Sequence, residues 1–350
     1  MSNERDAAAI NCFMLNELDT HQLSVIVRAA RRFGISRQAA LKRMRTLIKQ
    51  GDVKAIGSTK ARRYELVVKP VVDLEMKVKG LEEDIVYFQQ VRPAIGDVPD
   101  NIQRICNYGF TEMLNNVIDH SESDVVRIEV SRTPSVIELF VLDQGIGIFE
   151  KIKKTLGLQY DQQALAALSA GKFTTDSEHH SGQGIFFTSR VFDHFSILSG
   201  NLHFWHRTGR DDWLTEHKEH YLKGTFIRMR ICVSSTTTTK EVFDRFSTPN
   251  DEYGFARTHV PVSLSQVEKG SLTSRSQAKR VLDRFDQFEE VLLDFKHVES
   301  IGQAFADEIF RVFPRNNPTV KVTWTNANSE VEAMIQRAFR AGTVPPSKGK

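Results

Sequence analysis

Two short glycine motifs, each next to a regular element, constrain the fold of this chain more than any other feature. The first, DQGIG at residues 143–147, follows an apolar stretch at 136–142 that is typical of a buried strand. A carboxylate at a strand end, followed by glycines, suits recognition of an amino group, because the backbone can pass close to the ligand. The second, SGQGI at 181–185, precedes an apolar helix predicted over 185–192. Glycines before a helix offer free N–H groups and the positive end of the helix dipole to phosphate.

A third element, a helix predicted over residues 101–120, carries polar groups on one face. Its apolar residues recur at helical spacing. Glu112 and Asn116 are four residues apart, so they share the opposite face, one turn from each other. Glu112 and Asn116 could instead form a solvated helix face while the glycines only make turns. That alternative leaves the order of the three elements unexplained.

In this order the three elements resemble the GHKL ATPase superfamily of gyrase, Hsp90, histidine kinases and MutL. Within it, the anti-sigma-factor serine kinase branch is the nearest match. The resemblance covers residues 101–233 and implies ATP and Mg²⁺ as cofactors. It implies that Asp143 holds the adenine amino group and that Asn116 ligates Mg²⁺. It also implies that Glu112 is catalytic and orients or deprotonates the attacking water or hydroxyl.

The same resemblance implies further nucleotide contacts and a lid. Residues 149–180 would form the lid over the ATP. The remaining contacts would be Gly145, Gly147, Lys172, Gly182, Gln183 and Gly184. Histidine kinases carry a phosphoacceptor histidine before the ATP domain, whereas residues 71–100, predicted to be a connector, contain no histidine. The histidine kinase interpretation is therefore excluded.

Residues 1–70 have a strongly basic composition. They carry a formal charge of +8, whereas the whole chain carries +3. This asymmetry suggests that the N-terminal region meets a polyanion. The pattern predicts three helices and then a hairpin. After the first of them, a helix runs from Thr20 or His21 to Phe33, and a second follows over 37–50 between Ser36 as N-cap and Gly51 as C-cap.

This arrangement resembles the winged helix-turn-helix family over residues 18–68. The resemblance implies double-stranded DNA as a partner, with base edges met by the second helix and phosphates by the wing. The residues expected at DNA are Gln38, Lys42, Arg45, Lys49, Lys60, Arg62 and Arg63. A winged helix used for protein contacts or as a rigid spacer is the alternative.

The last part of the chain alternates strands and helices. Residues 234–256 are expected to be a linker. The pattern of residues 257–342 predicts a small sheet flanked by helices. Residues 343–350 are expected to be disordered. The loop at 299–302 and its flanks resemble STAS-type domains, the fold of anti-sigma-factor antagonists, and imply docking of a protein partner. Ser300 lies at the edge of the position that is phosphorylated in antagonists; an ordinary turn or helix-cap serine is its alternative role.

The three cysteines, Cys12, Cys106 and Cys232, lie far apart and form no C-x-x-C pair. We expect free buried thiols in a reducing cytoplasm, and neither a disulfide nor a zinc site. No apolar run approaches the length of a transmembrane helix, and no signal peptide is evident, so no membrane partner is expected.

The sequence therefore predicts a multidomain α+β protein with a winged helix, a GHKL α/β sandwich and a small STAS-like α/β domain. The expected function is a cytoplasmic regulator, in transcription, whose DNA binding and partner docking respond to Mg·ATP. Two alternatives stay open: a serine/threonine kinase that acts on its own STAS-like domain or on a partner, and a non-catalytic scaffold. The oligomeric state is also open, a homodimer included.

Overall fold

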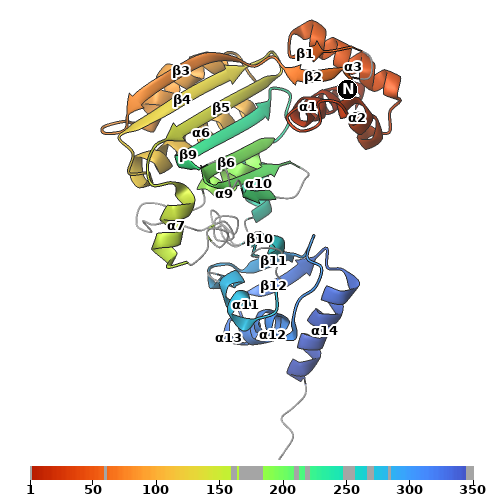
Figure 1. Ribbon diagram of the computed structural model, residues 1–350, viewed down its shortest axis with the longest axis vertical. Helices are drawn as coiled ribbons and strands as arrows, with labels where there is room; N and C mark the ends of the chain where they lie inside the picture. Colours follow the sequence, from red (N-terminus) through yellow and green to blue (C-terminus); the bar gives the residue numbers. More distant parts are fainter. Residues whose placement is uncertain are drawn as a thin grey trace, which may run out of the picture. The chain divides into compact units, whose positions relative to one another are not determined.

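The computed structural model is of mixed α/β type with several sheets (Figure 1). It describes residues 2–58, 61–158, 164, 184–208, 213–216, 221–246, 257–265, 272–282 and 285–343. The chain divides into two compact units. The first comprises Met1–Gly147, Thr188–Arg210 and His217–Thr239, and the second comprises Ile148–Phe187, Asp211–Glu216 and Lys240–Lys350. No helix of the described residues combines the length and the apolar character needed to cross a lipid bilayer.

In the first unit, six strands of the large sheet follow one another in the order β3-β4-β5-β9-β6-β7, each antiparallel to its neighbours. The strands are β3 (Lys69–Lys77), β4 (Val125–Arg132), β5 (Val136–Asp143), β6 (His194–Gly200), β7 (Leu202–Arg207) and β9 (Leu222–Cys232). On β5, Ile137, Leu139 and Val141 are at most 1% exposed. They alternate with other residues, so they share one face of the sheet. Helix α6 (Asp100–His120) contacts β5 and β9 and buries its apolar stripe (Figure 1).

The stretch 71–100, which we expected to be a connector, contributes to this unit in two ways. Its beginning belongs to β3, the edge strand that pairs with β4. Its second half forms short helical segments, α4 (Glu83–Val86), the π-helical turn η2 (Tyr87–Val91) and α5 (Arg92–Ile95). Tyr87 is 1% exposed and donates a hydrogen bond to the Gln103 carbonyl of α6 at 3.1 Å. The stretch is therefore part of the packed unit, whereas the sequence suggested only a connector.

The N-terminal residues form three helices and a hairpin, which we call the head (residues 2–66). Its elements are α1 (Ser2–Glu17), α2 (Val25–Phe33), α3 (Arg37–Gln50), β1 (Val53–Ile56) and β2 (Arg63–Leu66). The bounds of α3 agree with the prediction. The Ser36 hydroxyl accepts the Ala39 N–H at 3.1 Å, and Gly51 adopts φ +88° and donates to the Ile48 carbonyl. Both caps satisfy backbone groups that the helix leaves unpaired.

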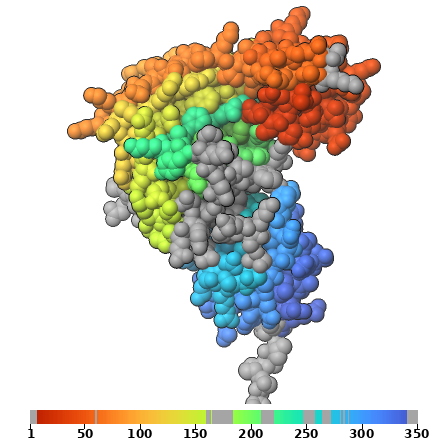
Figure 2. Space-filling view, in the orientation of Figure 1, coloured from red at the N-terminus to blue at the C-terminus, as the bar shows by residue number. Residues whose placement is uncertain are grey.

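An apolar cluster joins the head to one end of the sheet. Met14, Leu15 and Met44 of the head are at most 1% exposed, and they belong to one buried cluster with Val136 of β5 and Cys232 of β9. The cluster lies at the start of β5 and the end of β9. Figure 2 shows the N-terminal residues, in red, directly against residues of the sheet.

Polar contacts reinforce this junction at the β4–β5 turn. Asp52 follows α3 and is completely buried. Its carboxylate accepts the Thr133 hydroxyl at 2.6 Å, the Ser135 N–H at 2.8 Å and the Ser135 hydroxyl at 2.9 Å. A buried carboxylate is tolerated when its oxygens are satisfied in this way.

A buried ion-pair cluster forms the second polar contact. Arg230 of β9 is 0% exposed; its Nε donates to Glu138 at 2.6 Å, and one terminal nitrogen donates to Asp19 of the head at 2.9 Å. Arg228 also bridges Glu138 and Asp19. Two guanidinium groups thus face two carboxylates, so the cluster formed by these four side chains carries no net charge. We call it the junction cluster (Asp19, Glu138, Arg228 and Arg230).

The junction cluster lies on the sheet face opposite α6. Glu138 alternates with Ile137 and Leu139, whose side chains meet α6, and Arg228 and Arg230 alternate with the buried Ile227 and Met229. Burial alone would raise the pKa of Asp19, but His194, Arg230 and Arg228 hold that pKa well below its usual range. Burial also lowers the pKa of His194 to about 4, so its ring is neutral near pH 7.

The prediction of three free thiols is wrong for two of the cysteines. Cys12 of α1 and Cys232 of β9 form a disulfide, with Cα atoms 5.8 Å apart and a sequence separation of 220 positions. Only Cys106, buried in α6, is free. Packing of the head against the sheet brings the two residues together, and no local pattern in the sequence signals that contact.

The second unit contains a three-stranded parallel sheet in the order β10-β11-β12, close to the predicted alternation of strands and helices. Its strands are β10 (Arg257–Pro261), β11 (Glu290–Asp294) and β12 (Lys321–Thr325). Helical segments η3 (Val262–Ser265), α11 (Arg275–Val281), η4 (Phe285–Gln287), α12 (Gln303–Asp307), η5 (Glu308–Val312), α13 (Phe313–Asn316) and α14 (Ser329–Thr343) complete this fold. The unit also includes α7 (Ile148–Leu156), β8 (Trp213–Glu216) and most of α10 (Thr239–Phe246).

We expect Asp19→Ala to lower the free energy of unfolding by about 3 kcal/mol, because it leaves a buried guanidinium without its partner. The pKa of Asp19 is lowered from 3.8 on folding. Its contribution to the free energy of unfolding is therefore complete above pH 3.8 and is lost as the pH falls through the folded-state pKa. Urea unfolding at several pH values measures the difference between the two proteins.

Asp73→Ala is the matched control, because the Asp73–Arg127 pair lies on the exposed edge strand β3. It should leave the unfolding curve nearly unchanged. Equal losses in the two variants would mean that the junction cluster contributes no more than a surface ion pair.

Candidate functional site

The carboxylate of Asp143, the last residue of β5, is held in a fixed position. Asp143 is 3% exposed and falls in the alternation of Ile137, Leu139 and Val141, so its side chain lies on the face that meets α6. One of its oxygens accepts the Gly145 N–H at 2.8 Å. Burial raises the pKa of Asp143, while hydrogen bonds from Gly145 and from the backbone and side chain of Thr225 oppose that shift.

These bonds leave room for a ligand at Asp143. A carboxylate offers about four acceptor positions, and among the described residues its hydrogen-bond donors are Gly145 and Thr225. The group is therefore oriented by the chain and still has capacity to accept an N–H from a ligand. This is the arrangement that recognition of an amino group requires.

The loop after Asp143 is tied to the end of α6. The Ile146 N–H donates to the Ser121 carbonyl at 2.8 Å, and the Ser121 hydroxyl donates to the Val117 carbonyl at 2.7 Å. A Cβ atom at Gly145 would collide with the same Ser121 carbonyl. Glycine is therefore required there by the close approach of the loop to α6.

The second glycine of the loop meets β6 and β9. Gly147 adopts φ +85°, and a Cβ there would lie 2.6 Å from the Ser199 hydroxyl. That hydroxyl donates to the Gly224 carbonyl at 2.7 Å, and Gly224 itself passes close to the backbone of Asp143. At both glycines of the DQGIG motif, a residue with a Cβ atom would clash with neighbouring atoms, and Gly147 also needs its positive φ.

The polar face of α6 carries Glu112 and Asn116, one turn apart as predicted. Both side chains are partly buried. Asn116 Nδ2 is buried and has no hydrogen-bond partner among the described residues. Glu112 and burial together raise the pKa of Tyr108, the residue one turn earlier. Gly109 lies on the same side of α6, two turns before Asn116, and a Cβ there would collide with Phe192.

The orphaned amide of Asn116 fits a ligand role. An unpaired buried amide costs free energy unless a group other than the described residues satisfies it. The oxygen and nitrogen of an Asn amide exchange places by a half-turn, so the same position can present an oxygen. A neutral oxygen is a suitable ligand for Mg²⁺, which takes its other ligands from water and phosphate.

The second glycine motif is only partly described. Gly184 is the first residue of α9 (Gly184–Val191), close to the predicted start at 185. Lys172, Gly182 and Gln183 lie outside the described residues. The expected lid over 149–180 is described only at residues 149–158, mostly in α7, and at residue 164.

The residues expected at DNA are exposed wherever they are described. Gln38, Lys42, Arg45 and Lys49 lie along one face of α3. Among the described residues, Lys42, Arg45 and Lys49 form no ion pair. In the wing, Arg62 is exposed, and Arg63 pairs with Glu65 at 3.0 Å. Lys60 lies outside the described residues.

Four contacting residues of the Asp143 site escaped the sequence analysis: Ser121, Ser199, Gly224 and Thr225. A signal exists for two of them. Gly224 and Thr225 stand near the start of β9, where a glycine in an apolar strand indicates a close backbone approach. Ser121 and Ser199 give no such signal, because their role depends on the pairing of distant segments.

The second unit places Asp294 at the carboxyl end of β11. It accepts the Lys296 N–H and the Asn326 amide, both at 2.9 Å, and lies 3.3 Å from His259 Nε2. Burial alone would raise its pKa, but these partners lower the pKa of Asp294 to about 2. Ser300 is partly buried, and the N-cap of the following helix α12 is Gly302, so Ser300 does not have the helix-cap role.

The comparisons with known proteins bear on this second unit. The family described as "STAS-like domain of unknown function (DUF4325)" matches residues 277–332. The chain therefore carries a STAS-like domain in its C-terminal part, as the sequence predicted. No curated protein matches the chain.

Proposed function

We propose that this chain is an ATP-responsive regulator. Mg·ATP binds in a GHKL-type domain between the end of β5 and α6, and its binding alters DNA binding by a winged-helix head and docking by the STAS-like domain. The observation that carries the proposal is the buried carboxylate of Asp143, fixed by Gly145 and Thr225 and still able to accept a ligand N–H. An adenine amino group is a donor of the right kind.

In this proposal the nucleotide extends from Asp143 toward the polar face of α6. Asn116 supplies an oxygen to Mg²⁺, which neutralises phosphate charge when it is bound. The orphaned buried amide of Asn116 supports that assignment. Glu112, one turn before Asn116, would orient or deprotonate the attacking hydroxyl or water.

Strands β5 and β9 suggest how ATP binding at Asp143 could influence the head. β5 begins at Val136, in the apolar cluster with the head, and ends at Asp143. β9 carries Thr225 near one end and Cys232 at the other. Eight residues of strand span roughly 25 Å, so the two sites are connected by short, continuous elements. ATP shifts the head only to the extent that it binds one arrangement better than another.

We expect Mg·ATP to raise the melting temperature of the wild-type protein and to leave Asp143→Asn unchanged, because the amide cannot replace an acceptor oriented by two donors. At an ATP concentration about 100 times the Kd, the stabilisation should be about 2.7 kcal/mol. Differential scanning fluorimetry with and without Mg·ATP measures the shift.

Asp73→Asn, on the exposed edge strand, makes the same chemical change far from the site and should keep the full shift. A wild-type protein that does not respond to Mg·ATP, or an Asp143→Asn variant that responds fully, would refute nucleotide binding at this place.

The fate of the γ-phosphate separates a switch from a kinase. With γ-labelled ATP, we expect wild-type protein to release labelled phosphate and Glu112→Gln to bind ATP without releasing it, since the amide cannot take up a proton. Label that stays on the protein and disappears in Glu112→Gln would instead favour the serine/threonine kinase. Ser300→Ala then shows whether Ser300 is the acceptor.

The exposed cations of α3 support the DNA-binding part of the proposal. We expect Lys42→Ala/Arg45→Ala to weaken duplex binding and to lower the slope of log K against log salt by about 2, because each phosphate contact contributes about one unit. Gel shifts at several salt concentrations measure the slope.

Lys77→Ala/Lys79→Ala removes the same charge at exposed positions at and just after the end of β3. It should leave both affinity and slope unchanged. Equal effects of the two double variants would indicate attraction by overall charge, and an absence of binding would favour the winged helix as a protein-contact module.

A further inference from the structure

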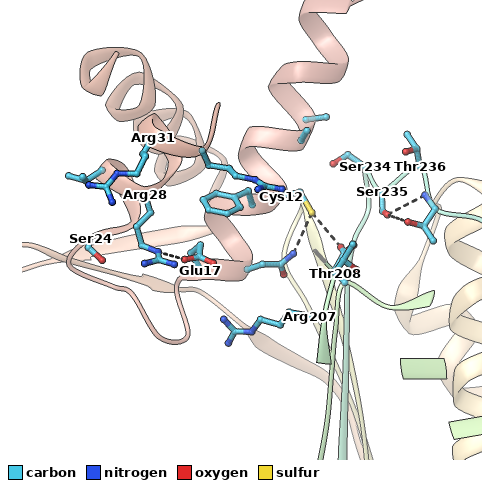
Figure 3. A pocket seen from close by; sticks show the side chains of 18 residues that line it. Cys12, Glu17, Ser24, Arg28, Arg31, Arg207, Thr208, Ser234, Ser235 and Thr236 are labelled. Carbon is cyan, nitrogen blue, oxygen red and sulfur yellow. Dashed lines mark hydrogen bonds and ion pairs between the residues drawn. The ribbon is translucent and has the colours of Figure 1, made fainter. Parts of the chain in front are cut away.

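A groove of about 1410 Å³ beside the head is lined by Cys12, one of the two cysteines of the disulfide (Figure 3). Helices α1 and α2 form one wall, and residues 234–237, after β9, belong to the other. Cys12 lines the groove, whereas Cys232 is 1% exposed and does not. Cys12 is partly buried and is therefore the cysteine of the disulfide that a small molecule in the groove meets.

The charge of the groove favours anions. Arg31 and Arg32 of α2 line it, both are exposed, and neither forms an ion pair with another described residue. The acidic side chains of the lining are already engaged. Glu17 pairs with Arg28, and Asp193 accepts the Cys232 N–H at 2.7 Å. Arg207 also lines the groove and donates to Thr20.

Polar groups surround the two sulfurs. The Asn16 amide nitrogen lies 3.5 Å from Cys12 Sγ and 3.9 Å from Cys232 Sγ, so its N–H groups can stabilise negative charge on either sulfur. Asp193 Oδ2 lies 3.4 Å from Cys12 Sγ. Burial raises the pKa of Asp193 to about 6, so this carboxyl takes up a proton more readily than an exposed one.

We propose that the Cys12–Cys232 bond is a thiol-exchange site, opened by a small anionic thiol that enters the groove along Arg31 and Arg32, and that its opening loosens the head from the sheet. The proposal is independent of nucleotide binding, because it rests on the groove, the disulfide and the arginines alone.

The exchange balances as two displacements. The thiolate RS⁻ attacks Cys12 Sγ; a bond forms between RS and Cys12, the Cys12–Cys232 bond breaks, and its electron pair stays on Cys232, which then takes up a proton. A second RS⁻ attacks the RS sulfur and releases Cys12 as a thiolate. The products are RSSR and two reduced cysteines, and RSSR re-forms the bond by the reverse steps.

Opening of the bond has a direct structural consequence. The disulfide connects α1 to β9 at a sequence separation of 220 positions. Its loss raises the conformational entropy of the unfolded chain and removes a covalent link at the junction. The apolar cluster and the junction cluster stay in place. We therefore expect a loosened head on a folded chain, not global unfolding.

The first experiment counts thiols in the full-length protein. After equilibration with excess oxidised 2-mercaptoethanesulfonate, denaturation and alkylation should label one cysteine, Cys106; after reduction, all three should be labelled. The reduced protein should melt several degrees lower and exchange the amide hydrogens of α1 faster. Three labels after oxidation, mixed disulfides on separate cysteines, or identical melting and exchange in the two states would overturn the proposal.

The second experiment tests the anion preference. We compare opening rates with 2-mercaptoethanesulfonate and with neutral 2-mercaptoethanol, each corrected for its thiolate fraction. The anionic thiol should react about tenfold faster at low salt. Arg31→Glu/Arg32→Glu should abolish that advantage, and Lys77→Glu/Lys79→Glu, with the same change of charge outside the groove, should keep it. No advantage in the wild type, or equal loss in both variants, would refute entry along the arginines.

Discussion

The complete burial of Arg230 constrains the arrangement of the first unit. A buried guanidinium is tolerated only with well-placed acceptors, and here one comes from β5 and the other from the head: Glu138 and Asp19. The sheet therefore needs the head to satisfy its own buried charge. This explains why residues 2–66 form one unit with the sheet. Without the head, Arg228 and Arg230 would share the single carboxylate of Glu138.

Strands β5 and β9 each contribute side chains both to the junction with the head and to the candidate site. β5 contributes Glu138 to the junction cluster and Asp143 to the candidate site, and β9 contributes Arg230 and Thr225. The two sets of side chains lie on opposite faces, since they fall on alternate positions along each strand. One face of β5 and β9 thus packs against α6, and the other face bonds to the head. A ligand at Asp143 can influence the head through displacement of these strands, without a flexible linker.

The sequence predicted what local patterns determine. The bounds of α3 and the roles of Ser36 and Gly51 follow from periodicity and capping, which act within one turn. The position of Asp143 at a strand end follows in the same way. Partners that come from distant segments leave no such signal, which is why β3, the Asp19–Arg230 pair and the Cys12–Cys232 bond were missed. The hydrogen bonds of Thr225 to Asp143 belong to the same class.

The contacts at the head–sheet junction differ in whether pH or the redox state alters them. The aliphatic side chains of the apolar cluster respond to neither protons nor thiols. Asp19 keeps its charge down to strongly acidic pH, because its lowered pKa lies below the usual range, and His194 stays neutral near pH 7. Only the Cys12–Cys232 bond changes with the redox state, and Cys12 is the cysteine of this bond that lines the groove. The junction therefore combines contacts that are constant under ordinary conditions with one covalent contact that small thiols can remove.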